Sequence, residues 1–463
     1  MSENTDVYIP PHPRPAPPIA SLIRTIKLGD GDLLSLLPAA AYQAEACELG
    51  YSRRSIKLFN APPLVKEILS DDGTLFPKSD LMVGALEALI GDSIFVSDGA
   101  KWRRQRAMIE PAFSMMRLER AFAAMEPAVE ACERRLSDAS AKDEAFSLDL
   151  AMSHLTADII CRTVFSAPLT SHAAREVFED FTTFERGVGQ VKVWRLIVDP
   201  AWRKVDQDAR VLDACQRIRK QIGALIDTHL APDAGFNDIA SAVIAARDAD
   251  TGKGFSRDEL IDQLGVFFLA GHETTASALT WAFYILAKRP DLAKRLRAEV
   301  DAVSGAGPID FAAVKKLLLT RSFFQETMRL YPPLTFLPRV ALQRGRIGKF
   351  RFRKGALIMI SPWTLHRHRM YWRAPNEFNA DRFMTGGDGA LNKDAYIPFG
   401  AGPHTCVGAG FAMIESVYIL ARLIRNFDIE ITDDAQIRPA ARLTTRPAKE
   451  ISVRARLHPE TSP

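Results

Sequence analysis

The sequence predicts a mainly α-helical protein with small β-sheets at its edges. Long segments place apolar residues at helical spacing, whereas strand signals are few and short. The composition, 47% hydrophobic and 25% charged residues in a chain of 463, is that of an ordinary globular protein and excludes disordered and fibrous architectures. We therefore expect one domain over residues 1–463, with a proline-rich arm over residues 1–40.

Charge and cysteine content exclude several function classes. Sixty basic and 56 acidic side chains leave a net charge of +4, too small a bias to indicate a nucleic-acid partner. The five cysteines include no C-x-x-C pair, which argues against a disulfide framework and a zinc ribbon and favours a reducing cytoplasm. The sequence has no signal peptide and no apolar run long enough for a membrane anchor. We expect a cytoplasmic protein.

The first half of the chain is expected to contain a short strand and several helices. The strand covers residues 55–60 and a helix follows over 62–69. An apolar loop is expected over residues 81–95, before a turn at 97–99. Helical periodicity then covers residues 101–136, 148–165 and 202–230.

The second half contains the clearest helix start, a capping box formed by Ser256 and Glu259. The helix that follows runs to about residue 288, a length of roughly 45–50 Å, and Pro290 begins another helix. Residues 350–360 are predicted to form a strand, a turn at Lys354-Gly355 and a second strand. A helix over 411–423 and a half-exposed strand over 450–456 complete the chain.

A segment rich in glycine surrounds Cys406 and precedes the helix over 411–423. Backbone N–H groups at a helix start favour a thiolate, so we expect them to lower the pKa of Cys406. Glycines allow a flat ligand to approach the backbone closely. A buried free cysteine is the usual interpretation of a lone cysteine, but the glycines favour a ligand site here.

This segment resembles the haem loop of the cytochrome P450 family, Phe-x-x-Gly-x-x-x-Cys-x-Gly, at Phe399, Gly402, Cys406 and Gly408. The resemblance implies the cytochrome P450 fold, a helical triangular prism around a buried haem. It also implies that Cys406 is the axial thiolate ligand of haem b, iron protoporphyrin IX. His404 stands where the family often has arginine, and the resemblance gives it a haem propionate as partner.

Three further segments match the family in the expected order. Glu326 and Arg329 are three residues apart on one predicted helix face, and with Arg382 they resemble the family's ion cluster. The implied role is structural, in holding the cysteine loop. The Trp102 and Arg106 pair resembles the family's propionate-binding Trp-x-x-x-Arg. Arg339 is expected to join Arg106 and His404 at the haem carboxylates.

The third match lies midway along the long predicted helix. The Thr274 hydroxyl is expected to donate to the Ala270 carbonyl and open the helix, while Gly271 leaves room for a diatomic ligand. The resemblance implies that Thr274 and Glu273 deliver protons during oxygen activation. Without the other motifs, a simple helix kink is the more ordinary interpretation of this segment.

Other polar residues have ordinary interpretations. His272 and Thr275 are expected to pack or to form hydrogen bonds, and His366 and His368 are interpreted as packing residues rather than a metal pair. One group of cations has two interpretations: a solvated surface, which is the ordinary one, or a basic patch that binds an acidic redox partner. Its residues would be Lys101, Arg103 and Arg104.

The resemblance implies a haem-thiolate monooxygenase that inserts one atom of O₂ into a substrate. Two electrons would come from NAD(P)H through a separate ferredoxin and ferredoxin reductase, or a flavodoxin, to a monomeric enzyme. Two alternatives stay open: a peroxide-using or hydroperoxide-rearranging enzyme, and a haem-binding sensor or carrier without catalysis.

The resemblance also implies a substrate pocket. Its expected lining is mostly apolar, which points to a terpenoid, fatty acid or steroid-like molecule. Glu87 is the one charge that could orient a polar group, although a solvent-facing position is the ordinary interpretation. The expected lining comprises residues 81–95, 182–193, Phe267, Phe268, Ala270, 334–337 and 444–445.

Overall fold

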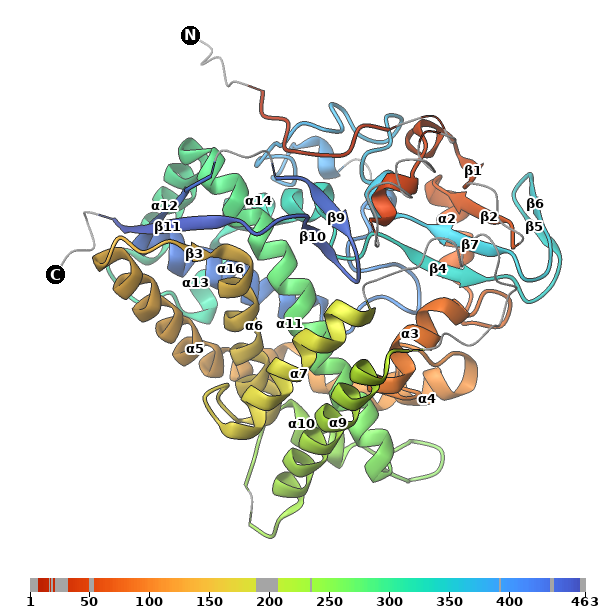
Figure 1. Cartoon of the computed structure of the whole chain (residues 1–463), viewed down its shortest axis with the longest axis horizontal. Coiled ribbons are helices and arrows are strands. Elements are labelled where there is room, and N and C mark those ends of the chain that lie inside the picture. The colour runs from red at the N-terminus through yellow and green to blue at the C-terminus, as the bar shows by residue number, and fades with distance from the viewer. Residues whose placement is uncertain are drawn as a thin grey trace.

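The computed structural model describes residues 7–15, 17, 20, 32–49, 54–188, 207–233, 235–390, 393–433 and 437–458. Helices dominate it and short strands form small sheets, which confirms the predicted fold class (Figure 1). The helices are α2 Pro62–Leu69, α3 Asp80–Ile90, α4 Gly99–Ile109, α5 Met115–Ala141, α6 Leu148–Phe165, α7 His172–Val188, α9 Ala209–Leu230, α10 Ile239–Ala245, α11 Arg257–Lys288, α12 Pro290–Ser304, α13 Phe311–Lys316, α14 Leu318–Leu330, α15 Pro362–Leu365 and α16 Ala409–Asn426. The strands are β1 Ala46–Glu48, β2 Ile56–Phe59, β3 Phe146–Ser147, β4 Leu337–Val340, β5 Gly345–Ile347, β6 Phe350–Phe352, β7 Leu357–Ile360, β8 Phe427–Ile431, β9 Pro439–Ala441, β10 Thr445–Pro447 and β11 Ser452–Leu457.

Helix α11 runs through the middle of the molecule and organises the core (Figure 1). It begins at the predicted capping box: the Ser256 hydroxyl accepts from the Glu259 N–H at 3.2 Å, and the Glu259 carboxylate accepts from the Ser256 N–H at 2.8 Å. Its side chains are buried around most of its circumference, because α3, α6, α9, α14 and α16 all pack against it. A helix buried on all sides is positioned rigidly, so α11 can fix the groups at its midpoint.

The strands form small separate sheets. One sheet has the order β1-β2-β7-β4, in which β2 and β7 are parallel, and another has the order β3-β11-β8. The two strands predicted on either side of Lys354-Gly355 are present but belong to different sheets: β6 pairs with β5, whereas β7 pairs with β2 and β4. The hairpin of β9 and β10 lies over the central helix and contributes to the site described below.

Two sequence predictions were wrong. The apolar segment 81–95 is helix α3 over most of its length, because the Ser79 hydroxyl caps the Leu81 N–H and Gly91 ends the helix. The predicted helix 101–136 is two helices. Pro111, which lacks an N–H donor, lies in a 3₁₀ turn between α4 and α5. Helix α7 was not predicted, and residues 202–206 of the predicted helix 202–230 lie outside the described residues.

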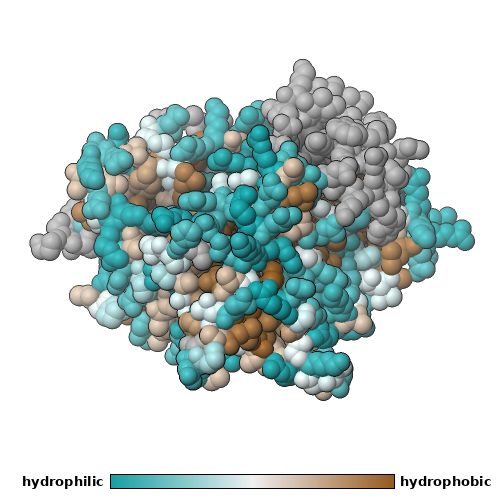
Figure 2. Space-filling model, turned by 60° about the horizontal axis from the view of Figure 1, so that its bottom comes forward, coloured by the Kyte–Doolittle hydropathy of each residue, from teal (hydrophilic) through white to brown (hydrophobic). Residues whose placement is uncertain are grey.

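Residues 7–15 of the N-terminal arm have no helix or strand and lie against the body. The Phe378 N–H donates to the Tyr8 carbonyl at 2.9 Å, and the Tyr331 hydroxyl donates to the Pro11 carbonyl at 2.6 Å. Figure 2 shows a face that is mainly hydrophilic, with small hydrophobic patches. Among the helices of the described residues, none combines the length and the apolar character needed to span a bilayer.

Candidate active site

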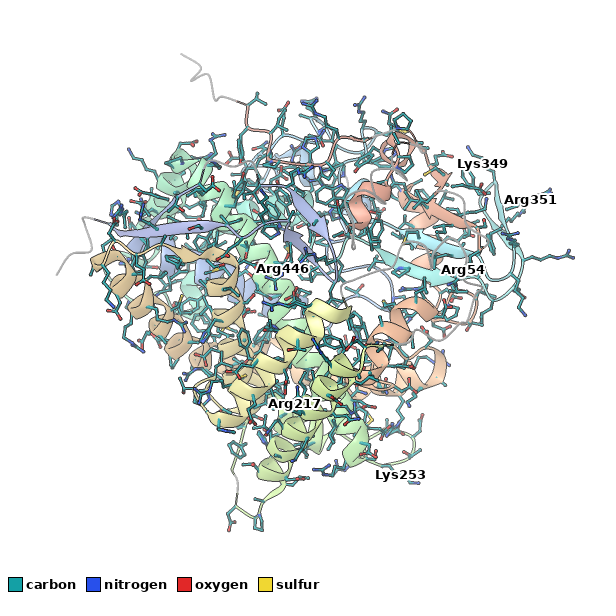
Figure 3. All side chains as sticks on the ribbon, viewed as in Figure 1. Arg54, Arg217, Lys253, Lys349, Arg351 and Arg446 are labelled. Carbon is teal, nitrogen blue, oxygen red and sulfur yellow. The ribbon has the colours of Figure 1, made fainter. Side chains whose placement is uncertain are left out.

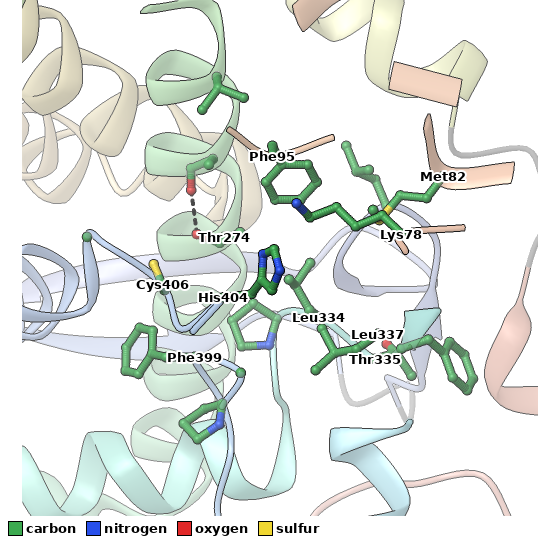
Figure 4. A pocket seen from close by; sticks show the side chains of 18 of the residues that line it. Lys78, Met82, Phe95, Thr274, Leu334, Thr335, Leu337, Phe399, His404 and Cys406 are labelled. Atoms are coloured by element: carbon green, nitrogen blue, oxygen red, sulfur yellow. Dashed lines mark hydrogen bonds between the residues drawn. The ribbon is translucent and has the colours of Figure 1, made fainter. Parts of the chain in front are cut away.

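A cavity of about 510 Å³ lies between the midpoint of α11 and the loop that leads into α16 (Figure 4). Most of its lining is aliphatic or aromatic, supplied by α3, α11 and the segment around β4. Polar groups gather mainly at the end that holds the cysteine loop. Residues on the apolar wall include Met82, Leu86, Phe95, Val266, Phe267, Leu334, Phe336, Leu337 and Leu443.

The loop before α16 presents the Cys406 sulfur to this cavity. The Cys406 N–H donates to the Phe399 carbonyl at 2.9 Å, which closes the loop on itself. Gly402 has φ +70°, and a Cβ there would lie 2.2 Å from the Leu69 carbonyl oxygen, so only glycine fits. The Cys406 side chain is accessible because it faces the cavity, but protein surrounds this space closely enough that burial still acts on the thiol.

The predicted low pKa of Cys406 was wrong for the free thiol. Burial raises the pKa of Cys406, and the opposing effects of the Gly408 N–H and the Arg106 charge are smaller. The Gly408 N–H at the helix start does favour the thiolate, but the cost of burying the charge is larger. Gly408 leaves the space beside the sulfur open, since a Cβ there would meet nothing closer than 3.9 Å.

Cationic and aromatic side chains border the cavity beside the cysteine loop, as the sequence predicts. The rings of Trp102 and His404 pack at a tilt of 38° with centroids 3.9 Å apart, and Arg106 donates from Nη1 to the Thr405 carbonyl at 2.5 Å. Arg339 is buried and borders the same space. Nδ1 of His404 is buried and has no hydrogen-bond partner among the described residues.

Lys78 is a fourth cation at this end that sequence reasoning missed. It is 7% exposed, and its ammonium donates to the Ser97 carbonyl and lies 3.7 Å from Asp98 Oδ1. The pKa of Lys78 is lowered to about 8: burial is the main cause, the charge of Asp98 opposes it, and the charge of Arg339 adds to it. A backbone bridge joins Lys78 to Arg339, which is distant in the sequence, so no local pattern indicated it.

Thr274 occupies the cavity wall at the midpoint of α11. Its hydroxyl donates to the Ala270 carbonyl at 2.6 Å, the bond that the sequence predicts (Figure 4). Gly271 also borders the cavity, but its main constraint is different from the one expected. A Cβ at Gly271 would lie 2.4 Å from Ile160 Cδ1, so the glycine permits the close contact of α11 with α6.

Glu273 lies next to Thr274 in sequence but does not border the cavity. Its carboxylate accepts two hydrogen bonds from the Arg446 guanidinium, one of them at 2.9 Å from Nε, and one from the Thr444 hydroxyl at 2.5 Å. Figure 3 shows Arg446 beside α11. Burial raises the pKa of Glu273, but Arg446 outweighs that effect and holds the pKa below its ordinary value. Glu185 is 3.6 Å from Arg446, and burial and the Glu273 charge raise its pKa to about 8.

The sequence matches the family model for cytochrome P450 over residues 11–454. The chain belongs to the cytochrome P450 family. Cyclooctatin synthase of Streptomyces melanosporofaciens is 31% identical over 416 residues, which cover 89% of this chain and 88% of the relative. Pentalenene oxygenase of Streptomyces avermitilis is 27% identical, covering 85% and 86%. A solved cytochrome P450DA haem domain has a TM-score of 0.78 at 22% identity, covering 97% of this chain and 98% of that one. The protein is therefore a cytochrome P450 monooxygenase, an oxidoreductase whose family uses haem.

The cytochrome P450 site fits a haem. A flat dicarboxylate group needs an open sulfur, a space without side chains beside it and cations for its carboxylates. Cys406 and Gly408 meet the first two needs. Lys78 and Arg339 supply the cations, and both are buried. Among the described residues, Asp98 is the only acid within 4 Å of either cation. The unpartnered His404 nitrogen gives a further polar atom for the same group.

The ion cluster expected behind the cysteine loop is assembled. Glu326 lies 2.6 Å from Arg329 and 3.0 Å from Arg382, and all three side chains are at most 2% exposed. Arg329 also donates to the carbonyls of His366, Pro375 and Glu377. The cluster therefore fixes the segment that precedes the haem loop.

Several smaller predictions have clear outcomes. His366 accepts from the Ile397 N–H at 2.8 Å through Nε2 and makes a second bond from Nδ1 to the Arg329 carbonyl, so it packs as expected. The basic-patch hypothesis is weakened because all three of its cations are in ion pairs. The pairs are Lys101 with Asp92, Arg103 with Asp72, and Arg104 with Glu259 and Asp248.

The expected pocket lining was wrong at several positions, and within the described part of 182–193 only Val188 borders the cavity. Phe268 packs against Phe181 rather than bordering the cavity, because it lies on another side of α11. Thr444 and Thr445 are bonded to Glu273 and to the Pro332 carbonyl, and the preceding turn, Arg442 and Leu443, borders the cavity instead. Glu87 does not border it, and residues 189–193 lie outside the described residues.

Proposed function

We propose that this cytochrome P450 hydroxylates a hydrophobic substrate, a terpenoid in preference to a fatty acid or steroid-like molecule. The observation that carries the proposal is the apolar cavity that ends at the Cys406 sulfur and the Thr274 hydroxyl. Relatives named for pentalenene and for cyclooctat-9-en-7-ol favour the terpenoid among the three classes. An apolar wall of this kind binds by shape and excludes water from the reaction.

Haem, when bound, supplies the redox chemistry that inserts one atom of O₂ into the substrate and releases the other as water. In our proposal Cys406 is its thiolate ligand, and Trp102, Arg106, Arg339, His404 and the newly found Lys78 hold its carboxylates. Ala270 and Gly271 would leave space for it on the α11 side, and Phe399, Gly402 and Gly408 would shape the cysteine loop that holds it. Two electrons come from NAD(P)H through a ferredoxin and its reductase, with a flavodoxin as the alternative.

We also propose that Thr274 and Glu273 manage protons. The Thr274 hydroxyl stands at the cavity and is oriented by the Ala270 carbonyl, so it can donate to a group bound there. Glu273 is one step removed, because its carboxylate must leave Arg446 before it can exchange a proton on the cavity side. The buried pair thus holds the acid away from the cavity in this structure.

The first test is the absorption spectrum of the reduced protein under carbon monoxide, for the wild type and Cys406→Ser. The proposal expects the strongly red-shifted Soret band of a thiolate-ligated complex in the wild type and its loss in the variant. A band that is unchanged in Cys406→Ser would overturn the ligand assignment.

Two further measurements address the alternative functions. Product formation with a reconstituted electron-transfer chain separates an oxygenase from a haem sensor or carrier. Turnover with peroxide alone, at rates that match the NAD(P)H-driven reaction, would favour the peroxide-using alternative.

A further inference from the structure

The hairpin of β5 and β6 carries a run of cations that the function described so far does not use. Residues 344–354 contain six basic side chains and no acid, and all six side chains are exposed. They are Arg344, Arg346, Lys349, Arg351, Arg353 and Lys354. Figure 3 shows Lys349 and Arg351 at the outer edge of the molecule.

The protein itself neutralises little of this charge. Lys349 lies 2.7 Å from Glu45, in a pair that is exposed on both sides. The cations without an ion pair to any described residue are Arg344, Arg346, Arg351 and Lys354. Glu67 and Asp71 line a surface hollow together with two of them, but the Asp71 carboxylate already accepts three backbone N–H groups of the turn that follows it.

Two of these cations face each other across the hairpin. Arg346 and Arg351 are directly opposite in the pairing of β5 with β6, a position at which like charges are destabilising. The other face of the hairpin holds it in place. Ile347 is fully buried there, and Phe350 and Phe352 pack edge-on against core phenylalanines with ring centroids 6.0 and 5.6 Å apart. The fold therefore presents the two arginines outward on a firmly anchored support.

Exposed leucines lie beside the cations. Leu342 is 38% exposed and Leu75 is 40% exposed, and the Leu342 N–H donates to the Leu75 carbonyl at 3.1 Å. Leu75 also lines the hollow that Arg344 and Arg346 border. Cations beside exposed apolar side chains suit a lipid surface, because the cations bind anionic headgroups while the apolar side chains enter the boundary with the acyl chains. An acidic protein would need only the cations, so the leucines favour lipid.

We propose that this surface docks the protein on a membrane that contains anionic lipids. We call it the basic hairpin surface, and it comprises Arg344, Arg346, Arg351, Lys354, Leu75 and Leu342. The contact is peripheral and reversible, since its attraction comes from headgroup charge and a small apolar area.

Docking has a consequence for the cavity. Strand β7 follows the hairpin after a short turn, and Leu357 and Met359 of β7 border the cavity. The basic hairpin surface therefore brings the β7 side of the cavity towards the lipid, in which a hydrophobic molecule dissolves. This consequence rests on the proposed function, whereas membrane binding does not.

Sedimentation of the haem-loaded protein with lipid vesicles tests the proposal without substrate. We expect binding to phosphatidylcholine vesicles that contain one-third phosphatidylglycerol, and no binding to pure phosphatidylcholine. Raising the salt from about 0.1 M to about 1 M should weaken the binding, because it shortens the range of charge attraction. Equal binding to both kinds of vesicle would overturn the role of headgroup charge.

Substitutions locate the surface. A cation near an anionic leaflet strengthens binding about five-fold, so the double variant Arg346→Gln/Arg351→Gln should bind roughly 25-fold more weakly. Arg217→Gln/Arg257→Gln is the matched control, since it removes the same charge from arginines that are 57% and 51% exposed on α9 and α11. The control should bind as the wild type does. Haem content should be unchanged in both variants.

Two outcomes would overturn the proposal. One is vesicle binding by Arg346→Gln/Arg351→Gln that equals that of the wild type. The other concerns the leucines: Leu342→Ser should weaken vesicle binding, and its full retention, together with tighter binding of the wild type to polyglutamate than to the mixed vesicles, would assign the surface to an acidic protein. Neither outcome bears on the proposed function, because no substrate or electron donor takes part.

Discussion

Thr274 and Thr280 make the same local bond on α11, but only Thr274 borders the cavity. Each hydroxyl donates to the carbonyl four residues earlier, at 2.6 Å and 2.8 Å. Thr274→Ala should therefore slow product formation and release peroxide, while substrate binding is kept, because the lost hydroxyl acts in proton delivery and not in the apolar contacts. Product and peroxide per electron are the quantities to measure. Thr280→Ala is the matched control, and equal effects of the two substitutions would contradict the proposed role.

Gly271 borders the cavity, but the contact that requires a glycine there is with Ile160 of α6. Gly271→Ala would place a Cβ 2.4 Å from Ile160 Cδ1, so we expect a loss of about 1–3 kcal/mol in the free energy of unfolding. The double variant with Ile160→Val should recover part of the loss, because the branch that clashes is removed. Urea unfolding of the wild type and the two variants measures the free energies of unfolding. An unchanged stability in Gly271→Ala would show that α11 and α6 can move apart without cost.

At the scale of elements, the Glu326 cluster connects α14 to the segment before the haem loop. Glu326→Ala would leave Arg329 and Arg382 buried without their carboxylate, a change that costs about 3–5 kcal/mol. We expect reduced haem content, measured as the ratio of Soret to protein absorbance. The exposed pair of Arg295 and Asp381 provides the control, since Arg295→Ala removes a bridge worth at most about 1 kcal/mol. Full haem content in Glu326→Ala would rule out the structural role.

Elements with strong local signals could be predicted from the sequence, and those defined by distant contacts could not. The sequence predicted helix α6 from its helical periodicity and the start of α11 from its capping box, because each signal lies within a few neighbouring residues. Helix α3 was missed because it is apolar on several sides, so its helical period is weak. Within the site, motif spacing located Cys406 and Thr274, whereas Lys78 and Arg446 depend on partners far along the chain.

At the scale of the whole molecule, one contact makes stability depend on pH away from the site. His229 on α9 lies 2.8 Å from Asp238, which caps α10. Burial lowers the pKa of His229, but the hydrogen bonds that its ring donates to the Asp238 carboxylate and the Leu225 carbonyl outweigh burial and raise the pKa above its ordinary value. A raised pKa stabilises the fold fully below the unfolded value of about 6.5, and this stabilisation is lost as pH rises through the folded value.

The prediction is that His229→Gln destabilises the protein more at about pH 6 than at about pH 9. Burial raises the pKa of Asp238, but the hydrogen bonds that it accepts from His229 and Ser241 outweigh burial and lower the pKa below its ordinary value. The stabilisation that the Asp238 carboxylate provides is therefore lost only in acid. Denaturant unfolding of both proteins at the two pH values gives the difference. A pH-independent difference would mean that the contact is uncharged.

The buried cations beside the cysteine loop also have a consequence for biogenesis. Lys78 and Arg339 repel each other in a poorly hydrated space, so the chain without its cofactor carries an internal electrostatic cost. A ligand that binds only the folded state stabilises it by mass action, and a dicarboxylate removes this cost as well. We therefore expect bound haem to raise the yield and the protease resistance of this protein, in proportion to the haem supplied during expression.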